Sequence, residues 1–152
     1  MSRVLLGVGN RFSADDGVGP MVAERLEGAP GWLAIDCGIA LENASGIVTR
    51  ERPELLVIVD AARMGLVPGS IRRLPTSSPD RMLASTHGLP LTFILDRLGD
   101  AAGEIVLIGV EPRDVTFGAD MSNVVSAAAD ELVSILRDDE LLQIERLGEG
   151  PG

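Results

Sequence analysis

Residues 4–27 read VLLGVGNRFSADDGVGPMVAERLE: a short apolar run, then a loop with glycines and aspartates, then an amphipathic segment. The run Val4–Val8 is continuous and rich in valine and leucine, which favours a strand buried on both faces of a sheet. In Pro20–Glu27 the apolar residues share one helical face, and Pro20 suits the first turn, where its missing N–H is not needed. A strand that leads through a loop into a helix is the repeating unit of α/β proteins.

The same alternation continues along the chain. Further apolar runs predict strands, and further amphipathic segments, with apolar residues at three- and four-residue spacing, predict helices. The predicted strands are Leu33–Ile35, Leu55–Val59, Ile105–Val110 and a more exposed one at Ser70–Leu74, and the further helices are Leu89–Leu98 and Met121–Leu136. The sequence therefore predicts an α/β fold, a three-layer αβα sandwich with a mostly parallel sheet and helices on both faces.

Length and charge limit the class of protein. The chain has 152 residues, so we expect a single domain over residues 1–147 and a flexible tail at 148–152. Its 13 basic and 23 acidic residues give a net charge of −10, which argues against nucleic-acid and anionic-membrane binding. No apolar run approaches the roughly 18 residues of a transmembrane helix, and no signal peptide is evident. We expect a cytoplasmic protein that acts as a monomer.

Three residue types are scarce or missing. The chain has no lysine, which excludes mechanisms that depend on a lysine side chain. The sole cysteine, Cys37, excludes an internal disulfide and a cysteine-built metal site. Any chemistry that needs imidazole must use the single histidine, His87.

Ligands of such folds bind at the carboxyl ends of the strands, where acidic residues are frequent in this chain. Asp16, Asp60 and His87 are predicted to lie at these ends and form the candidate site. Two carboxylates about 4 Å apart repel by some 1–4 kcal/mol unless a cation or a proton intervenes. Imidazole and carboxylate suit transition metals, and three protein ligands leave positions open for exchange. Asp15, Asp36 and Glu111 are the other acids at these ends.

Each candidate also has a purely structural interpretation. Asp16 could cap the helix that begins near Gly17–Pro20, Asp60 could be a turn residue at a strand end, and His87 could be an ordinary loop histidine. Two other binding sites are disfavoured. The third glycine of a dinucleotide-binding motif would fall at Phe12, and a phospho-accepting receiver domain needs a lysine after its last strand.

Four separated motifs resemble the hydrogenase maturation endopeptidases, in the order in which that family carries them. The likeness extends from about Val4 to Leu136 and is nearest to the branch that processes hydrogenase-3-type [NiFe] enzymes. The motifs are Val8-Gly9-Asn10 with Asp15-Asp16-Gly17-Val18-Gly19-Pro20, Ile58-Val59-Asp60-Ala61, Thr86-His87-Gly88-Leu89-Pro90-Leu91, and Ile108-Gly109-Val110-Glu111-Pro112. The chief departure is Cys37, where the family commonly has glycine.

This resemblance implies a function that composition cannot show. It implies an endopeptidase that removes the C-terminal extension of a [NiFe]-hydrogenase large-subunit precursor after nickel insertion. The metal-recognising residues of the family match Asp16, Asp60 and His87, and the precursor, as partner, supplies the nickel. The alternative is a non-catalytic, metal-dependent binding module or chaperone for a metalloenzyme precursor.

Three chemical mechanisms stay open at this level. Asp16, Asp60 and His87 can act together on a nickel held by substrate cysteines and so position the scissile bond for attack by water. Asp16 and Asp60 can instead share a proton, as in aspartic-type endopeptidases. A Cys37–His87 dyad can supply a nucleophile, although the resembling proteins lack the cysteine. We expect the first mechanism, with Cys37 as a small buried hydrophobe.

Overall fold

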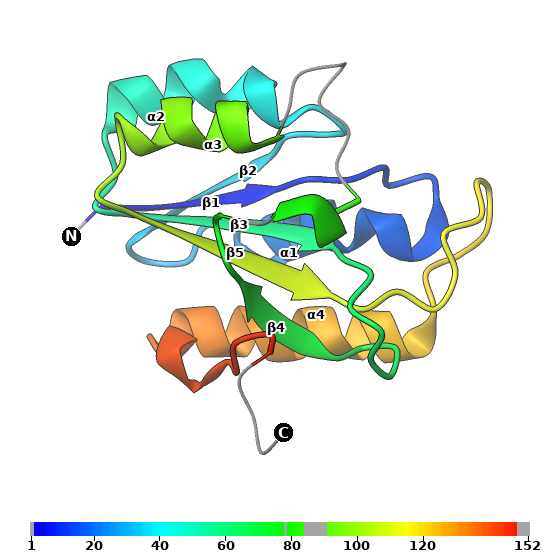
Figure 1. Ribbon diagram of the computed structural model, residues 1–152. Helices are drawn as coiled ribbons and strands as arrows, with labels where there is room; N and C mark the ends of the chain where they lie inside the picture. Colours follow the sequence, from blue (N-terminus) through cyan, green and yellow to red (C-terminus); the bar gives the residue numbers. More distant parts are fainter. Residues whose placement is uncertain (1, 78, 84–90, 149–152) are drawn as a thin grey trace.

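A five-stranded sheet in the order β2-β1-β3-β5-β4 forms the centre of the molecule (Figure 1). The computed structural model describes residues 2–77, 79–83 and 91–148. The strands are β1 (Arg3–Gly7), β2 (Trp32–Asp36), β3 (Leu55–Ala61), β4 (Ile71–Leu74) and β5 (Glu104–Val110). All neighbours pair parallel except β4, which pairs antiparallel with β5 at the edge. The predicted strands are all confirmed, with ends that differ by one or two residues.

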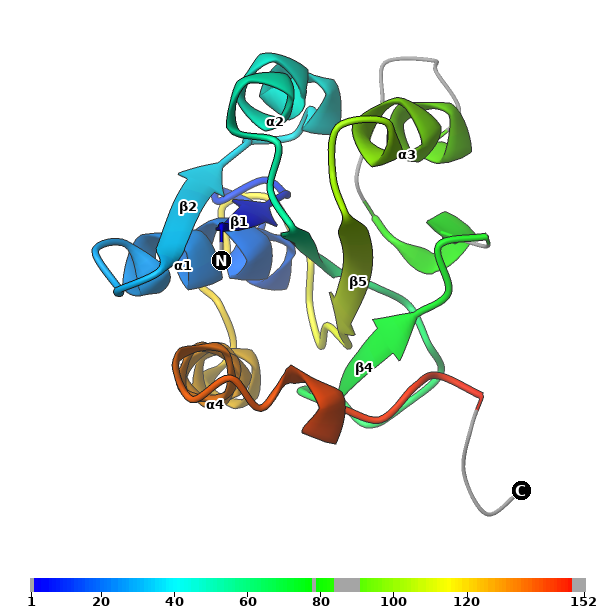
Figure 2. The ribbon, with the colours of Figure 1, turned by 90° about the vertical axis from the view of Figure 1, so that its left-hand side faces the viewer.

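Helices cover both faces of the sheet, which confirms the predicted three-layer arrangement (Figure 2). On one face lie α1 (Val18–Leu26) and α4 (Asn123–Arg137), and on the other lie α2 (Ser45–Glu51) and α3 (Leu91–Gly99). The part of the predicted helix Leu89–Leu98 that precedes Leu91 lies outside the described residues. Short 3-10 turns occur at η1 (Ala14–Gly17), η2 (Leu41–Ala44), η3 (Pro79–Arg81) and η4 (Leu141–Gln143). Among the helices so described, none is long and apolar enough to cross a membrane.

Strand β3 shows why the apolar runs form a central sheet. Its residues alternate between two cores: Val57 and Val59 pack toward α1 and α4, whereas Leu56 and Ile58 pack toward α2 and α3. All of them are fully buried. A strand that contributes to a core on each side must be apolar at nearly every position, and this produces a continuous run in the sequence.

Helix α2 was not predicted. Its sequence, Ser-Gly-Ile-Val-Thr-Arg-Glu, contains a glycine and β-branched residues, which have low helix propensity. Val48 is its only buried residue, so the segment has no apolar periodicity to detect. Packing against the sheet and α3 stabilises this short helix, because isolated helices of this length do not form in water.

The loop after β1 is held close to the ends of β1 and β3. A Cβ atom at Gly19 would lie 2.4 Å from the carbonyl oxygen of Val8 and 2.5 Å from that of Val59. Only glycine permits an approach this close. Helix α1 therefore begins directly against the strand ends, and η1, which precedes it, packs against β3.

Candidate active site

The structure brings Asp16 and Asp60 to the same edge of the sheet. Asp60 lies in β3 near its carboxyl end, and Asp16 lies in η1, which packs against β3. Neither the turn interpretation of Asp60 nor the capping interpretation of Asp16 is correct, as their local geometry shows below. His87 lies outside the described residues.

Asp16 is bound to the protein through one of its two carboxylate oxygens. Its Oδ2 accepts a hydrogen bond from the backbone N–H of Asn10 at 3.0 Å. Its Oδ1 is buried and accepts no hydrogen bond from the described residues. Burial raises the pKa of this carboxyl, and the Asn10 hydrogen bond partly opposes that effect. Asp16 is not an N-cap: Ser13 precedes η1, Gly17 precedes α1, and neither helix start has a side-chain cap.

Asp60 is a fully buried carboxylate within a strand. It pairs in register with Gly109 of β5, and strand alternation places it on the same face as Ile58 and Ala62. A Cβ atom at Gly109 would lie only 2.7 Å from the Ala62 Cβ. The absence of a side chain at Gly109 therefore lets Ala62 and Leu74 pack closely against β5 beside Asp60.

The chain before His87 is paired with the chain after Asp60. Leu83 donates its backbone N–H to the carbonyl oxygen of Ala61 at 3.0 Å, and Ala62 forms an antiparallel bridge with Met82. These contacts fix residues 81–83 beside the end of β3. The last described residue before the undescribed stretch is therefore bonded to the immediate neighbour of Asp60.

Asp15, by contrast, binds the loop between β5 and α4. This residue is fully buried, and its Oδ2 accepts the backbone N–H groups of Arg113 at 2.8 Å and Asp114 at 3.1 Å. Its Oδ1 accepts the N–H of Ser122 at 2.7 Å, and the Ser122 hydroxyl lies within 3.0 Å of both oxygens. Asp15 thus anchors the loop between β5 and α4 to η1, a role that sequence analysis missed.

Glu111 anchors another loop in the same way. It is buried, and its Oε1 accepts the backbone N–H groups of Met64 at 2.8 Å and Leu66 at 3.0 Å. These bonds hold the segment that follows Asp60 against the end of β5. Of the acids at the strand ends, Asp15 and Glu111 therefore support the loops, while Asp16 and Asp60 are the candidates for chemistry.

The described residues contain no group of three or more His, Cys, Asp or Glu side chains placed to hold a metal ion. Asp36, the other acid at this edge, is engaged elsewhere. Its Oδ1 accepts the N–H of Gly38 at 2.8 Å, and its Oδ2 pairs with Arg11 at 3.1 Å. Asp16 and Asp60 alone would leave a bound metal incompletely coordinated.

Comparison with known proteins identifies the family. The chain matches the model of the hydrogenase maturation protease HycI over residues 20–139. It is 39% identical over 133 residues to the hydrogenase 3 maturation protease of Escherichia coli K12, covering 86% of this chain and 85% of that relative. The chain belongs to the hydrogenase maturation protease family.

Solved structures agree with this assignment. The solution structure of the endopeptidase HycI from Escherichia coli superposes with a TM-score of 0.87 at 36% identity, covering 99% of this chain and all of the other. A [NiFe] hydrogenase maturation protease HycI from Thermococcus kodakarensis superposes with a TM-score of 0.78 at 31% identity, covering 92% of each chain. The protein is thus a hydrogenase maturation endopeptidase, which confirms the peptidase prediction.

In this maturation protease, Cys37 is poorly suited to act as the nucleophile. Its side chain is buried in the core beneath α2 and α3. Burial raises the pKa of the thiol to about 12, and the negative charge of Asp36 adds to the rise. The reactive form of cysteine is the thiolate, which is scarce at neutral pH when the pKa is this high.

We therefore expect Cys37→Ala to process precursor at close to the original rate. Alanine removes the thiol but leaves a small apolar side chain, and a buried thiol acts mainly as a hydrophobe. The measurement is the rate of mass loss from the precursor, with a melting curve to confirm folding. Complete loss of activity in a folded Cys37→Ala protein would restore the cysteine-peptidase mechanism.

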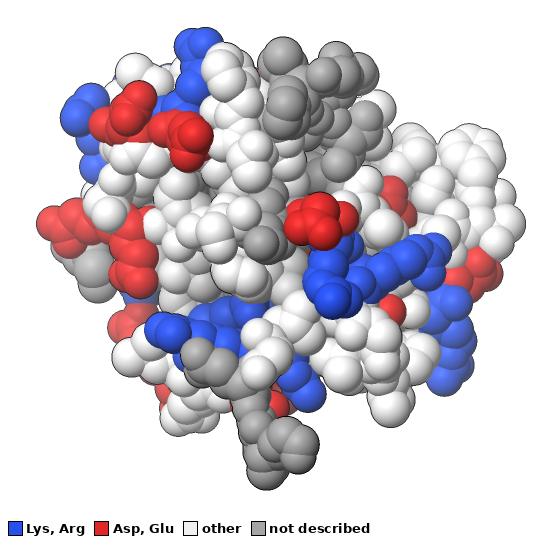
Figure 3. Space-filling model, viewed as in Figure 1, with Lys and Arg blue, Asp and Glu red and all other residues white. Residues whose placement is uncertain are grey.

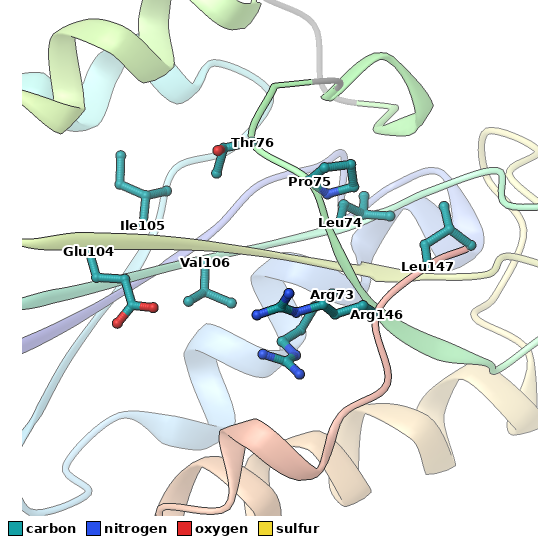
Figure 4. Close-up of a pocket in the computed structure, with 9 residues that line it drawn as sticks. All are labelled: Arg73, Leu74, Pro75, Thr76, Glu104, Ile105, Val106, Arg146 and Leu147. Carbon is teal, nitrogen blue, oxygen red and sulfur yellow. The ribbon is translucent and has the colours of Figure 1, made fainter. Parts of the chain in front are cut away.

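One surface hollow formed by described residues lies away from this site (Figure 4). Its volume is about 290 Å³, and it is lined in part by Arg73 of β4, by Glu104 and Val106 of β5, and by Arg146. Glu104 begins β5, whereas Asp60 pairs with Gly109 near the other end of that strand. The hollow is therefore lined by neither Asp16 nor Asp60.

Proposed function

We propose that this maturation endopeptidase, which processes the precursor of the [NiFe]-hydrogenase large subunit, removes the C-terminal extension once nickel has been inserted. Asp16, Asp60 and His87 bind the nickel while substrate cysteines still hold it. Their contact with the metal places the scissile bond for attack by water. Nickel is therefore part of the substrate in this proposal, and no resident metal is required.

The observation that carries the proposal is that the buried Oδ1 of Asp16 accepts no hydrogen bond from the described residues. A buried carboxylate oxygen that accepts no hydrogen bond costs about 1–3 kcal/mol in desolvation. A cation at this position would compensate that cost. Asp16 lies at the edge that holds Asp60, and a nickel ion with ligands from the substrate would complete a coordination sphere that these two residues begin.

Two routes for activating water remain alternatives within the proposal. In one, the nickel polarises the water or the scissile carbonyl, and the carboxylates only hold the metal. In the other, the buried Asp60 carboxylate accepts a proton from the attacking water, as a general base. Membership in a protease family favours either route over a chaperone that binds without cutting.

The direct test is a cleavage assay with nickel-free and nickel-loaded precursor in parallel. We expect a mass loss at the precursor's C-terminus only in the nickel-loaded sample, because the metal supplies the contact with Asp16. Equal cleavage of both samples would contradict nickel recognition. Formation of a complex without cleavage would favour the chaperone alternative.

We also expect the isolated protease to bind Ni²⁺ weakly. Two carboxylates and one imidazole leave coordination incomplete, and the substrate cysteines that would strengthen binding are absent. Titration calorimetry on the purified protein measures this affinity. Stoichiometric binding with a Kd of about 1 nM, near −12 kcal/mol, would contradict the proposal that the substrate supplies the metal.

A further inference from the structure

Among the described residues, four of the seven exposed large apolar side chains lie in loops at the active edge. Four loops follow the parallel strands β1, β2, β3 and β5, and each carries one exposed large hydrophobic residue. These residues are Phe12, Ile39, Val67 and Phe117, here called the apolar rim. We propose that the apolar rim is the docking surface for the folded body of the large-subunit precursor, an inference that rests on the proposed function.

Backbone hydrogen bonds join the four loops into one surface. Gly9 donates to Gly38 at 2.8 Å, which links the Phe12 loop to the Ile39 loop. Gly118 donates to Phe12 at 2.7 Å, which links the Phe12 and Phe117 loops. Gly69 donates its N–H to the carbonyl oxygen of Glu111 at 2.8 Å, which ties the Val67 loop to the end of β5. The rim is therefore organised before any partner binds, which reduces the entropy lost on association.

The two aromatic members of the rim are both exposed to solvent. The whole chain has three phenylalanines, one tryptophan and no tyrosine, so aromatic residues are scarce. Phe12 is 65% exposed and Phe117 is 74% exposed. Aromatic side chains are enriched in protein interfaces and dominate their binding energy. Beside Phe12 lies a cleft of about 340 Å³, whose lining is both apolar and charged and includes Met21, Met121, Arg11, Glu24 and Asp120.

The rim is connected to the catalytic residues as well as being near them. Asn10 donates its backbone N–H to Asp16, and its side-chain Oδ1 accepts the N–H of Phe12 at 2.9 Å. A partner that contacts Phe12 is thus linked to Asp16 through a single intervening residue, Asn10. Such an apolar ring around polar groups excludes water, and electrostatic interactions are stronger where water is excluded.

The extent of the rim indicates a folded surface rather than a peptide alone. Its loops come from β2, β1, β3 and β5, which are consecutive in the sheet. Three interstrand spacings amount to about 14 Å, whereas a single extended peptide occupies one spacing of about 4.8 Å. Figure 1 shows these loops gathered at the end of the sheet opposite the N-terminus, and in Figure 3 the upper part of that end is uncharged, with basic and acidic residues below it. The precursor is the one protein that must reach this edge for cleavage.

The test measures steady-state processing of nickel-loaded precursor by the double variant Phe12→Ser/Phe117→Ser. We expect the KM to rise about tenfold or more while kcat stays within about twofold, because the substitutions remove docking contacts and leave the catalytic residues in place. The matched control is Leu142→Ser. Leu142 is 81% exposed on η4, at the opposite end of the molecule (Figure 1). The Leu142→Ser variant should therefore have the same KM as the wild type.

Unchanged KM in the double variant would overturn the inference. So would sedimentation showing that the wild type is a dimer and that the double variant is a monomer with normal KM, because the rim would then bind a second copy. Failure of the proposed function gives a different result: nickel-free and nickel-loaded precursor would be cleaved alike, whatever the effect of the rim substitutions.

Discussion

Asp16→Asn is expected to abolish the processing of nickel-loaded precursor. Asparagine preserves the shape of the side chain, and its amide oxygen can still accept the N–H of Asn10, but the negative charge is lost. An opposite charge at about 4 Å contributes roughly 4 kcal/mol at an effective dielectric of 20, which corresponds to about a thousandfold in rate if the contact is realised in the transition state. Single-turnover cleavage followed by mass spectrometry measures the loss.

The same variant should fold at least as stably as the wild type. Burial raises the pKa of the Asp16 carboxyl, so in the relevant pH range the folded state binds a proton more tightly than the unfolded chain does. Asp16 therefore lowers the stability of the fold progressively as the pH rises from the ordinary value of 3.8 through the raised folded pKa. Asparagine does not titrate, so any stabilisation by Asp16→Asn should be present at pH 7 and decrease toward pH 4.

Asp130→Asn provides a matched control for the loss of one negative charge. Asp130 lies on α4, where it pairs with Arg25, and its side chain is 70% exposed. This variant should process precursor normally. A folded Asp16→Asn protein that also trims nickel-loaded precursor at the normal rate would remove Asp16 from the site, and the three-residue nickel site would then be wrong.

The fold was predictable because its central strands are buried on both faces. A continuous apolar run such as Ile105–Val110 is typical of a central strand. Strands that alternate with amphipathic helices along the chain then favour parallel pairing. Helix α2 was not predictable because its helical state comes from its neighbours rather than from its own apolar pattern. Where tertiary contacts decide the local structure, the sequence alone carries little signal.

The candidate site was predictable in part. The rule that ligands bind at strand carboxyl ends placed Asp16 and Asp60 at one edge, as the structure shows. The rule could not separate Asp16 from Asp15, because it locates a loop and not the direction of a side chain. The structure supplies the distinction: η1 is a 3-10 turn, in which successive residues differ by about 120° in direction, so the two adjacent aspartates face different ways.

Asp15→Ala is expected to have the largest effect on stability of any substitution considered for this protein. Alanine would leave the buried N–H groups of Arg113, Asp114 and Ser122 without their acceptor. Each unsatisfied buried donor costs about 1–3 kcal/mol, so we expect a loss of about 3 kcal/mol or more in the free energy of unfolding. At about 2–4 °C per kcal/mol for a chain of this size, the Tm should fall by roughly 6–12 °C.

The expected effects at Asp15 and Asp16 are opposite, which separates a structural role from a catalytic one. Asp15→Ala and Asp16→Asn alter adjacent acids, yet the first should destabilise the fold and the second should leave it intact and inactive. Asp15→Ala should also lower the affinity for precursor, because Asp15 holds the loop that carries Phe117. A drop in Tm with a raised KM and a nearly normal kcat, measured below the transition temperature, would establish Asp15 as a positioning residue. Undiminished stability together with lost cleavage would instead place Asp15 in the catalytic site, and the division of labour between the two aspartates would be wrong.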